Sequence, residues 1–193
     1  MSDQSNGWEA VAQRFMAARS PVVGVSAVRR WAQTLPNNPS VLDVACGSGV
    51  PVAGALMEEG CIVSGVDASP TLVAAFRIRF PHAAIACESA EESSFFDTTY
   101  HGVVAIGLLF LVPPTTQRKL LQKLARVVKP DGRLLFTAPR DACSWTDVLT
   151  GRVLVSLGSD EYAAILRRER MSVSAGFRDE RGNYYLDVVK QPE

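Results

Sequence analysis

Residues 41–49 read Val-Leu-Asp-Val-Ala-Cys-Gly-Ser-Gly and predict a buried strand, a tight turn and the start of a helix. Glycine has no side chain, so main-chain N–H groups in such a turn can contact a ligand directly. Gly47 and Gly49 supply that freedom here. The stretch therefore predicts a cofactor site of the nucleotide type at the end of a strand.

A second acidic residue follows the next apolar run. Asp67 lies 20 residues after Gly47 and comes directly after the run from Cys61 to Val66. A carboxylate in this place can accept hydrogen bonds from both hydroxyls of a ribose. Two strand ends are therefore expected to converge on one adenosine.

Missing residues narrow the choice of cofactor. The dinucleotide pattern needs a third glycine where Val52 stands, which makes NAD the second choice. Gly49 and Gly54 have the spacing of a phosphate-binding loop, but Ala55 and Leu56 replace its Lys and Ser/Thr. Residues 41–76 contain no Lys or Arg and include four acidic residues. This region suits a positively charged cofactor without phosphate, such as a sulfonium.

These features resemble the class I S-adenosylmethionine-dependent methyltransferases over nearly the whole chain. The family's first strand and glycine turn look like residues 41–49, and its acid after the second strand matches Asp67 in Gly-Val-Asp-Ala-Ser-Pro. Val-Lys-Pro-Asp-Gly-Arg-Leu-Leu-Phe, residues 128–136, is similar to the family's turn into the fifth strand. The resemblance implies S-adenosyl-L-methionine as the cofactor.

The resemblance also implies roles for individual residues. Asp43 would reach the ammonium of the cofactor directly or through water, beside the backbone of residues 45–47, and Asp67 would hold the ribose. Ser89 or Glu91 would lie against the adenine, although residues 88–91 are equally consistent with a solvated acidic loop. Residues 106–108 would line the methyl face. The implied cofactor site comprises Arg19, Asp43, Ala45, Cys46, Gly47, Ser48, Gly49, Asp67, Ala68, Ser89, Ala90, Glu91, Ile106, Gly107 and Leu108.

Helical and strand periods alternate along the chain and predict an α/β fold. We expect a Rossmann-like, doubly wound, mostly parallel seven-stranded sheet with a C-terminal antiparallel hairpin, in an α/β/α sandwich. The expected strands are 41–45, 61–66, 83–87, 102–106, 133–137, 171–178 and 184–190. Helices are expected near 50–59, 70–79, 115–128 and 160–170, after a first helix with Trp8, Val11, Ala12 and Phe15 on one face and a second that begins at Ser20-Pro21.

Length and composition predict one domain. The chain has 193 residues and is 47% hydrophobic, which suits a single domain with residues 1–38 as a helical cap and 39–193 as the core.

The four cysteines lack metal-binding or disulfide-rich spacing and are expected to be buried, reduced thiols. With no signal peptide pattern or membrane-spanning stretch, a soluble cytoplasmic protein without bound metal is expected.

No residue is expected to act as a catalytic base. His82 and His101 precede strands and should lie at the edge of the sheet opposite the ligand. Since a sulfonium is a strong leaving group, direct in-line displacement needs mainly alignment and exclusion of water. Other candidate bases cannot be distinguished by sequence and are not assigned a role. They are Glu9, Glu91, Cys143 and Tyr162.

The acceptor is expected to be a small molecule. The 20 basic and 20 acidic residues form no long basic run, which disfavours nucleic acid. Candidate pocket residues are Trp8, Phe15, Leu108, Leu109, Phe110 and Trp145, with Arg14, Arg19 and Arg140 as possible partners of an anion. Arg19 could hold the cofactor's carboxylate or an anionic acceptor. A binding module without turnover and a nicotinamide-dependent oxidoreductase are the alternative functions, and oligomeric state is not readable.

Overall fold

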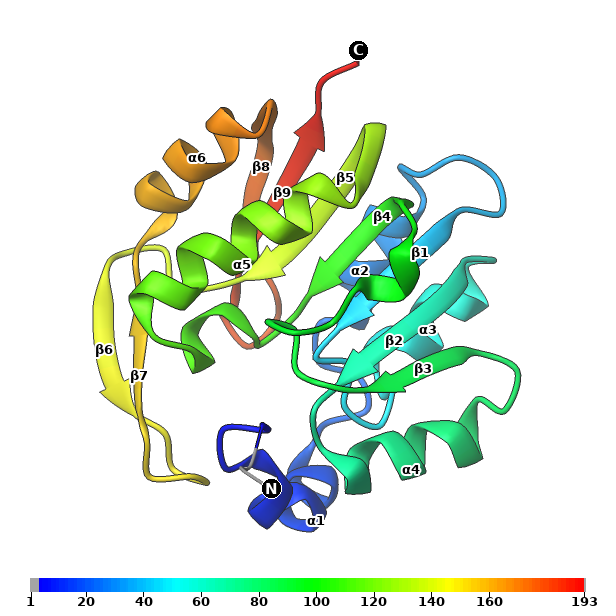
Figure 1. Ribbon diagram of the computed structural model, residues 1–193, viewed down its shortest axis with the longest axis vertical. Coiled ribbons are helices and arrows are strands. Elements are labelled where there is room, and N and C mark those ends of the chain that lie inside the picture. The colour runs from blue at the N-terminus through cyan, green and yellow to red at the C-terminus, as the bar shows by residue number, and fades with distance from the viewer. Residues whose placement is uncertain (1–3, 193) are drawn as a thin grey trace.

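A seven-stranded sheet forms the centre of the computed structural model, which describes residues 4–192 (Figure 1). The strand order is β3-β2-β1-β4-β5-β9-β8. Neighbouring strands are parallel from β3 to β5, whereas β9 is antiparallel to both β5 and β8. The strands are β1 (Ser40–Val44), β2 (Ile62–Asp67), β3 (Ala84–Cys87), β4 (Tyr100–Ala105), β5 (Val128–Thr137), β8 (Met171–Arg178) and β9 (Tyr184–Lys190).

The strand order changes direction at β1. The chain proceeds from β1 to β2 and β3 on one side, and then crosses to β4 and β5 on the other. In open parallel sheets, ligands bind beyond the carboxyl ends of the strands where the order reverses. This topology places the expected ligand crevice beyond the adjacent ends of β1 and β4.

Helices cover both faces of the sheet. On one face, Trp31 and Leu56 share a buried cluster with Val41. On the other, Leu121 packs in a cluster with Leu42, because successive strand residues point to opposite faces. The helices are α1 (Trp8–Ala18), α2 (Val25–Ala32), α3 (Val52–Glu58), α4 (Pro70–Arg79), α5 (Pro114–Arg126) and α6 (Ser159–Arg168), with short 3-10 turns η1 (Phe95–Asp97) and η2 (Leu109–Leu111).

The expected fold class is confirmed, and the expected elements agree to within a few residues except at two starts. Strand β5 begins at Val128, five residues before the expected start, and the predicted start of the second helix is wrong. Helix α2 begins at Val25, after Gly24 in the left-handed conformation at φ +78°. Ser20 instead stabilises the preceding turn, where its Oγ accepts a hydrogen bond from the Val23 N–H at 3.3 Å. The Ser-Pro pair therefore initiates a turn that precedes the helix.

In the described part of the chain, no helix combines the length and apolar character needed to cross a membrane.

A small second sheet was not expected from the sequence. Strands β6 (Cys143–Thr146) and β7 (Val153–Ser156) pair antiparallel after the end of β5. Cys143 is exposed here, and Cys87 is exposed at the end of β3. The expectation of buried thiols is wrong for these two cysteines, because β6 and the end of β3 lie outside the packed core, whereas Cys46 and Cys61 are buried.

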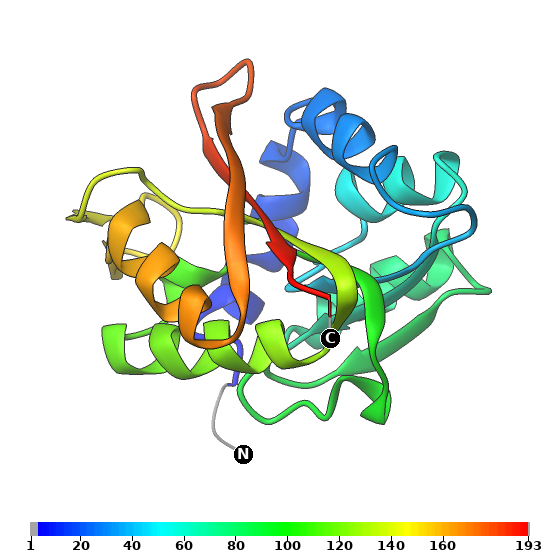
Figure 2. The same cartoon turned by 90° about the horizontal axis from the view of Figure 1, so that it is seen from above.

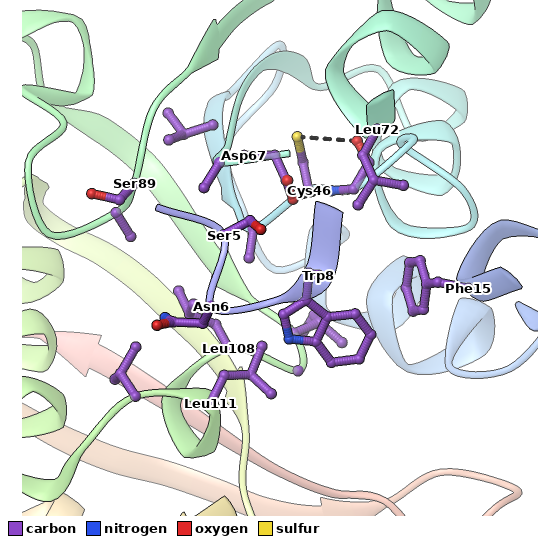
Figure 3. A pocket seen from close by; sticks show the side chains of 18 of the residues that line it. Ser5, Asn6, Trp8, Phe15, Cys46, Asp67, Leu72, Ser89, Leu108 and Leu111 are labelled. Carbon is purple, nitrogen blue, oxygen red and sulfur yellow. Dashed lines mark hydrogen bonds between the residues drawn. The ribbon is translucent and has the colours of Figure 1, made fainter. Parts of the chain in front are cut away.

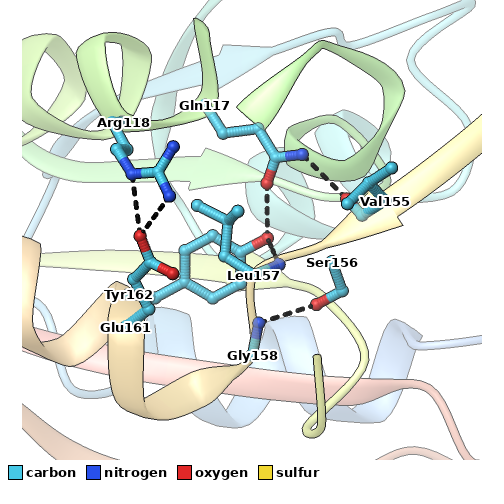
Figure 4. A network of polar contacts seen from close by, with 8 residues as sticks. All are labelled: Gln117, Arg118, Val155, Ser156, Leu157, Gly158, Glu161 and Tyr162. Atoms are coloured by element: carbon cyan, nitrogen blue, oxygen red, sulfur yellow. Dashed lines mark hydrogen bonds and ion pairs between the residues drawn. The ribbon is translucent and has the colours of Figure 1, made fainter. Parts of the chain in front are cut away.

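A buried polar network ties this second sheet to the main body (Figure 4). The Tyr162 hydroxyl of α6 donates to Gln117 Oε1 of α5 at 2.6 Å and accepts from the Leu157 N–H at 3.1 Å. Gln117 Nε2 donates to the carbonyls of Val112, at 2.9 Å, and Val155, at 2.7 Å. The Gln117 and Tyr162 side chains are fully buried, so one amide group holds β7, η2 and α6 together.

We expect Gln117→Leu to lower the free energy of unfolding by about 1–3 kcal/mol, because it leaves buried carbonyl groups and the Tyr162 hydroxyl without partners. Urea denaturation measures the change. Tyr162→Phe removes one hydroxyl and should have a smaller effect. Equal stability of Gln117→Leu and the wild type would contradict this interpretation of the network.

Candidate functional site

A cavity of about 400 Å³ opens at the carboxyl ends of β1, β2 and β4 (Figure 3). Asp43 reaches it from β1, Asp67 from the last position of β2, and Ile106 from the residue after β4. This is the edge of the sheet at which the strand order predicts a ligand.

The Asp67 carboxylate joins the turn after β1 to the start of α4. Its Oδ2 accepts a hydrogen bond from the Gly47 N–H at 2.8 Å, and its Oδ1 accepts one from the Ser69 N–H at 2.9 Å. Ser69 in turn caps α4 by accepting from the Leu72 N–H. The two loops that border the cavity are therefore held by one side chain, and Oδ1 and Oδ2 each retain a further lone pair.

Glycines leave open main chain along the cavity. Gly47 has a φ of +57°, and a Cβ built on it would meet only the Phe15 ring, at 3.6 Å. A Cβ on Gly107, where φ is +79°, would meet nothing within 4 Å. The Gly107 N–H donates to Thr137 Oγ1 at 2.7 Å, which holds this turn in place. Both positions present backbone to a space that a ligand can fill.

Asp43 is a buried carboxyl group with an unused oxygen. Its Oδ2 is the one buried side-chain N or O atom without a hydrogen-bond partner within residues 4–192. Burial first, and then the nearby charge of Asp67, raise the pKa of Asp43 to about 8 against the opposing charge of Arg19. Because a buried acceptor without a donor is costly, this group is suited to a cationic ligand.

Acidic groups predominate around the cavity. Among residues 4–192, its lining includes five carboxyl groups, those of Asp43, Asp67, Glu88, Glu91 and Asp147, and a single cation, Arg19. The Arg19 guanidinium lies 5.6 Å from the centre of the Phe15 ring and makes no hydrogen bond or ion pair with the described residues. Burial lowers the pKa of Arg19, while Tyr185 and Asp43 raise it. The cavity therefore favours a ligand with more positive than negative charge.

Residues 41–132 match a family described as a methyltransferase domain. The chain therefore contains a methyltransferase domain, which is consistent with the expected class I S-adenosylmethionine-dependent methyltransferase. The match begins with β1 and extends into β5, and so includes the glycine turn and Asp67. No curated protein matches the sequence.

Solved methyltransferases share the fold. The 1,6-didemethyltoxoflavin-N1-methyltransferase of Burkholderia thailandensis, with bound 1,6-didemethyltoxoflavin and S-adenosylhomocysteine, has a TM-score of 0.73 at 18% identity, over 96% of this chain and 84% of that one. The magnesium protoporphyrin IX methyltransferase of Synechocystis, with bound S-adenosylmethionine, has a TM-score of 0.74 at 15% identity, over 99% and 98%. An amino pentose methyltransferase from Micromonospora echinaspora has a TM-score of 0.72 at 14% identity, over 94% and 96%.

The structure brings nearly all of the sequence-predicted cofactor residues of this methyltransferase to one cavity. All of them line it except Ser48 and Gly49. A Cβ on Gly49 would come within 2.4 Å of the Phe80 ring, so this glycine is required by packing behind the turn. The Ser48 carbonyl accepts from Arg79 Nη1 at 2.9 Å. These two residues support the turn, and their predicted contact with cofactor stays a prediction.

The turn after β3 contributes more than the residues expected from the sequence. Ser89, Ala90 and Glu91 line the cavity, and so does Glu88. Ser89 Oγ accepts a hydrogen bond from the Glu92 N–H at 3.3 Å, and Glu88 accepts one from Ser93 at 2.7 Å. These bonds make residues 88–93 an ordered acidic turn at the cavity wall. Which of its residues contacts an adenine remains a prediction.

Sequence reasoning missed the segment that precedes α1. Gln4, Ser5 and Asn6 line the cavity, and Figure 3 shows Ser5 and Asn6 in the same strip of chain as Trp8. Gln4 Nε2 donates to the Glu92 carboxylate at 2.8 Å, which ties this segment to the turn after β3. Short polar residues without periodicity carry no sequence signal for this position.

Glu9 anchors α1 to the start of α4. Its carboxylate accepts hydrogen bonds from the Thr71 hydroxyl, at 2.6 Å, the Thr71 N–H, at 3.2 Å, and the Ser69 hydroxyl. A carboxylate is favourable at the positive end of a helix. This contact places α1 beside the cavity, and Glu9 itself does not line the cavity.

A second cavity of about 390 Å³ adjoins the first. Six residues line both cavities, namely Arg19, Ile106, Gly107, Phe110, Trp145 and Asn183. Of the expected pocket residues, Leu109 is instead fully buried in the core, and Arg14 and Arg140 line neither cavity. Arg19 is therefore the one predicted anion partner that the fold brings to the site.

The unassigned candidate bases lie mostly away from the cavities. Tyr162 is buried in the polar network, and Cys143 lines neither cavity. His101 lies at the start of β4, where its Nδ1 accepts from the Ser40 N–H at 3.1 Å. Burial raises the pKa of Cys46 well above its usual range, so this lining thiol stays protonated. Glu91 is the only one of the four unassigned candidates that lines the first cavity.

Stability should depend on pH through Asp43. The folded protein holds the Asp43 proton up to a pKa of about 8, whereas the ordinary value is 3.8, so its stabilising contribution declines as pH rises through this interval. We expect the free energy of unfolding to fall more steeply with pH in the wild type than in Asp43→Asn, by up to about 1.4 kcal/mol per pH unit.

Urea denaturation at several pH values between 4 and 8 measures this difference. Asp160→Asn, at an exposed position in the first turn of α6, is the matched control and should follow the wild type. Parallel pH profiles for wild type and Asp43→Asn would show that Asp43 does not retain a proton in the folded protein.

Proposed function

We propose that this methyltransferase binds S-adenosyl-L-methionine in the first cavity and transfers its methyl group to a small-molecule acceptor in the second. The observation that carries the proposal is the buried Asp43 carboxyl group, which borders a glycine-lined cavity and has one oxygen without a hydrogen-bond partner. A cationic donor from a ligand would satisfy that oxygen and favour the ionised carboxylate.

The charges of the cavity fit this cofactor. S-adenosylmethionine carries an ammonium, a sulfonium and one carboxylate, and the cavity offers several carboxyl groups and one guanidinium. A nucleotide with several phosphates would meet the same carboxyl groups with repulsion. Arg19 is the group that could hold the cofactor's carboxylate, or an anionic acceptor.

The family resemblance and the geometry support one assignment of roles. Asp43 would bind the ammonium, and the open backbone at Gly47 would lie along the methionine part. Asp67 would use its remaining lone pairs for the ribose hydroxyls. The acidic turn at residues 88–91 would lie beside the adenine, and residues 106–108 would face the reacting methyl group.

Methyl transfer in this site needs positioning more than proton transfer. When bound, the cofactor supplies a methyl group on a positively charged sulfur, which a nucleophile can displace in line. The protein holds the two reactants on either side of Gly107, and Trp8 and Phe15 help to exclude water from the first cavity. Alignment and a dry site can supply most of the rate acceleration. We assign no catalytic base.

A small acceptor is supported by the limited volume of the second cavity, about 390 Å³. The structural neighbours act on small molecules, by name 1,6-didemethyltoxoflavin, magnesium protoporphyrin IX and an amino pentose. We propose that residues 1–38 act as a cap on a single domain, since α1 and the segment before it border the first cavity.

Asp67→Ala should weaken binding of S-adenosylhomocysteine by about 1–3 kcal/mol, because ribose hydroxyls would lose their partner in a partly buried site. Isothermal titration calorimetry measures the affinity. Asp160→Ala is the control on the surface of α6, and circular dichroism checks that Asp67→Ala remains folded without its bonds to Gly47 and Ser69. An unchanged dissociation constant in a folded variant would remove Asp67 from the cofactor site.

Gly47→Val should weaken the same binding at least as much, through backbone strain at positive φ and a side chain in the cavity. Gly60→Val is a matched control, because Gly60 also has a positive φ of +83° and a Cβ there meets nothing within 4 Å. The two variants should lose comparable stability, while Gly47→Val alone loses affinity in calorimetric titration. Normal affinity in Gly47→Val would place the cofactor elsewhere.

A further inference from the structure

The walls of the second cavity come from segments far apart in the sequence. Phe110 belongs to η2, Trp145 to β6, and Tyr184 and Tyr185 to β9. The Phe110 and Trp145 rings lie 5.3 Å apart, centre to centre, with their planes at 55°. Tyr185 is stacked on Phe177 at 5.4 Å with an interplanar angle of 5°, which fixes its ring. Four aromatic side chains around one small space favour a flat, unsaturated ligand.

The charge of this cavity is opposite to that of the first. Its lining includes two cations, Arg19 and Arg178, and no carboxyl group among the described residues. The nearby Asp179 is engaged by its own turn. Its Oδ1 accepts from the N–H groups of Arg181 and Asn183, and its Oδ2 accepts from Asn183 Nδ2 at 2.8 Å and the Tyr185 hydroxyl at 3.3 Å.

Arg178 is held in place but keeps most of its hydrogen-bond donors free. Its guanidinium lies 5.6 Å from the centre of the Tyr184 ring, and Nη1 donates to the Gly182 carbonyl at 2.6 Å. Within residues 4–192, the guanidinium makes no other hydrogen bond and no ion pair. An arginine has five N–H donors in a planar fork, which suits a carboxylate or a similar planar anion.

The tip of the β8–β9 hairpin, drawn in orange and red, projects beyond the rest of the sheet (Figure 2), and Arg178 is the last residue of β8. Glu180 at the tip of the hairpin accepts a hydrogen bond from the Gly24 N–H at 2.9 Å, just before α2. This contact fixes the hairpin against the N-terminal helices. Arg178 therefore faces the second cavity from one side, and Arg19 reaches it where the two cavities meet.

We propose that the second cavity binds a small aromatic anion as the methyl acceptor, with its negative group held by Arg178 and by the positive charge of Arg19. This inference rests on the proposed function only in naming the ligand as the acceptor. The preference for an anion follows from the cavity's own residues. Carboxylates of one- or two-ring aromatic compounds are the chemical class that fits.

The test compares ligands of equal shape and different charge. Binding of 4-hydroxybenzoate and 4-hydroxybenzamide, and of indole-3-carboxylate and indole-3-carboxamide, is measured by calorimetry with and without saturating S-adenosylhomocysteine. We expect at least one acid to bind about tenfold or more tightly than its amide, the effect of a charge-assisted hydrogen bond. Arg178→Gln should lower that ratio about tenfold and leave the affinity for S-adenosylhomocysteine unchanged. Arg181→Gln, on the same hairpin but outside both cavities, should leave the ratio unchanged.

Three results would overturn the inference. Either acids and amides bind equally, or none of the four compounds binds to protein that binds S-adenosylhomocysteine. A ratio that Arg178→Gln does not alter would exclude Arg178 and overturn the proposed contact. If the protein does not bind S-adenosylhomocysteine, the proposed cofactor is wrong. The titrations done in the absence of S-adenosylhomocysteine still show whether the second cavity prefers an acid to its amide.

Discussion

The Asp67 carboxylate is the contact on which the site depends. It accepts hydrogen bonds from the Gly47 N–H in the turn after β1 and from the Ser69 N–H at the start of α4. It therefore joins two loops that meet only because β1 and β2 are paired in parallel. Ser69 and Thr71 at the start of α4 then bind Glu9, which brings α1 beside the same space. One carboxylate and its neighbours therefore link the sheet, a covering helix and the N-terminal segment.

The two adjoining cavities differ in charge although they share a wall. The first is bordered by carboxyl groups, among them that of Asp43, one oxygen of which is buried without a hydrogen-bond partner. The second is bordered by aromatic rings and two arginines. Because Gly107 lies on the shared wall without a side chain, ligands on the two sides can approach each other closely there. Opposite electrostatic preferences would direct a cationic donor and an anionic acceptor to different sides.

Much of the fold could be predicted from local sequence. The alternating apolar runs predicted the strands of the main sheet, and Ser69-Pro70 correctly marked the start of α4, where Ser69 caps the helix. Ser20-Pro21 failed in the same role because Gly24, four residues later, is the residue that adopts the left-handed conformation before α2. The β6–β7 pair was missed, since the contacts that hold it to the main body come from distant segments, among them the Gln117 amide of α5 and the Phe110 ring of η2.

The amino-acid sequence alone determined the fold class, the glycine turn at residues 45–49 and the two acidic residues at adjacent strand ends. Each of these features depends on a short run of apolar residues and on the few residues that follow it. Only the tertiary structure decided that Asp43 is buried without a partner, that Gln4 and Asn6 border the first cavity, and that Arg178 faces the second. Burial, electrostatic environment and the meeting of distant loops depend on packing in three dimensions, and no local pattern encodes them.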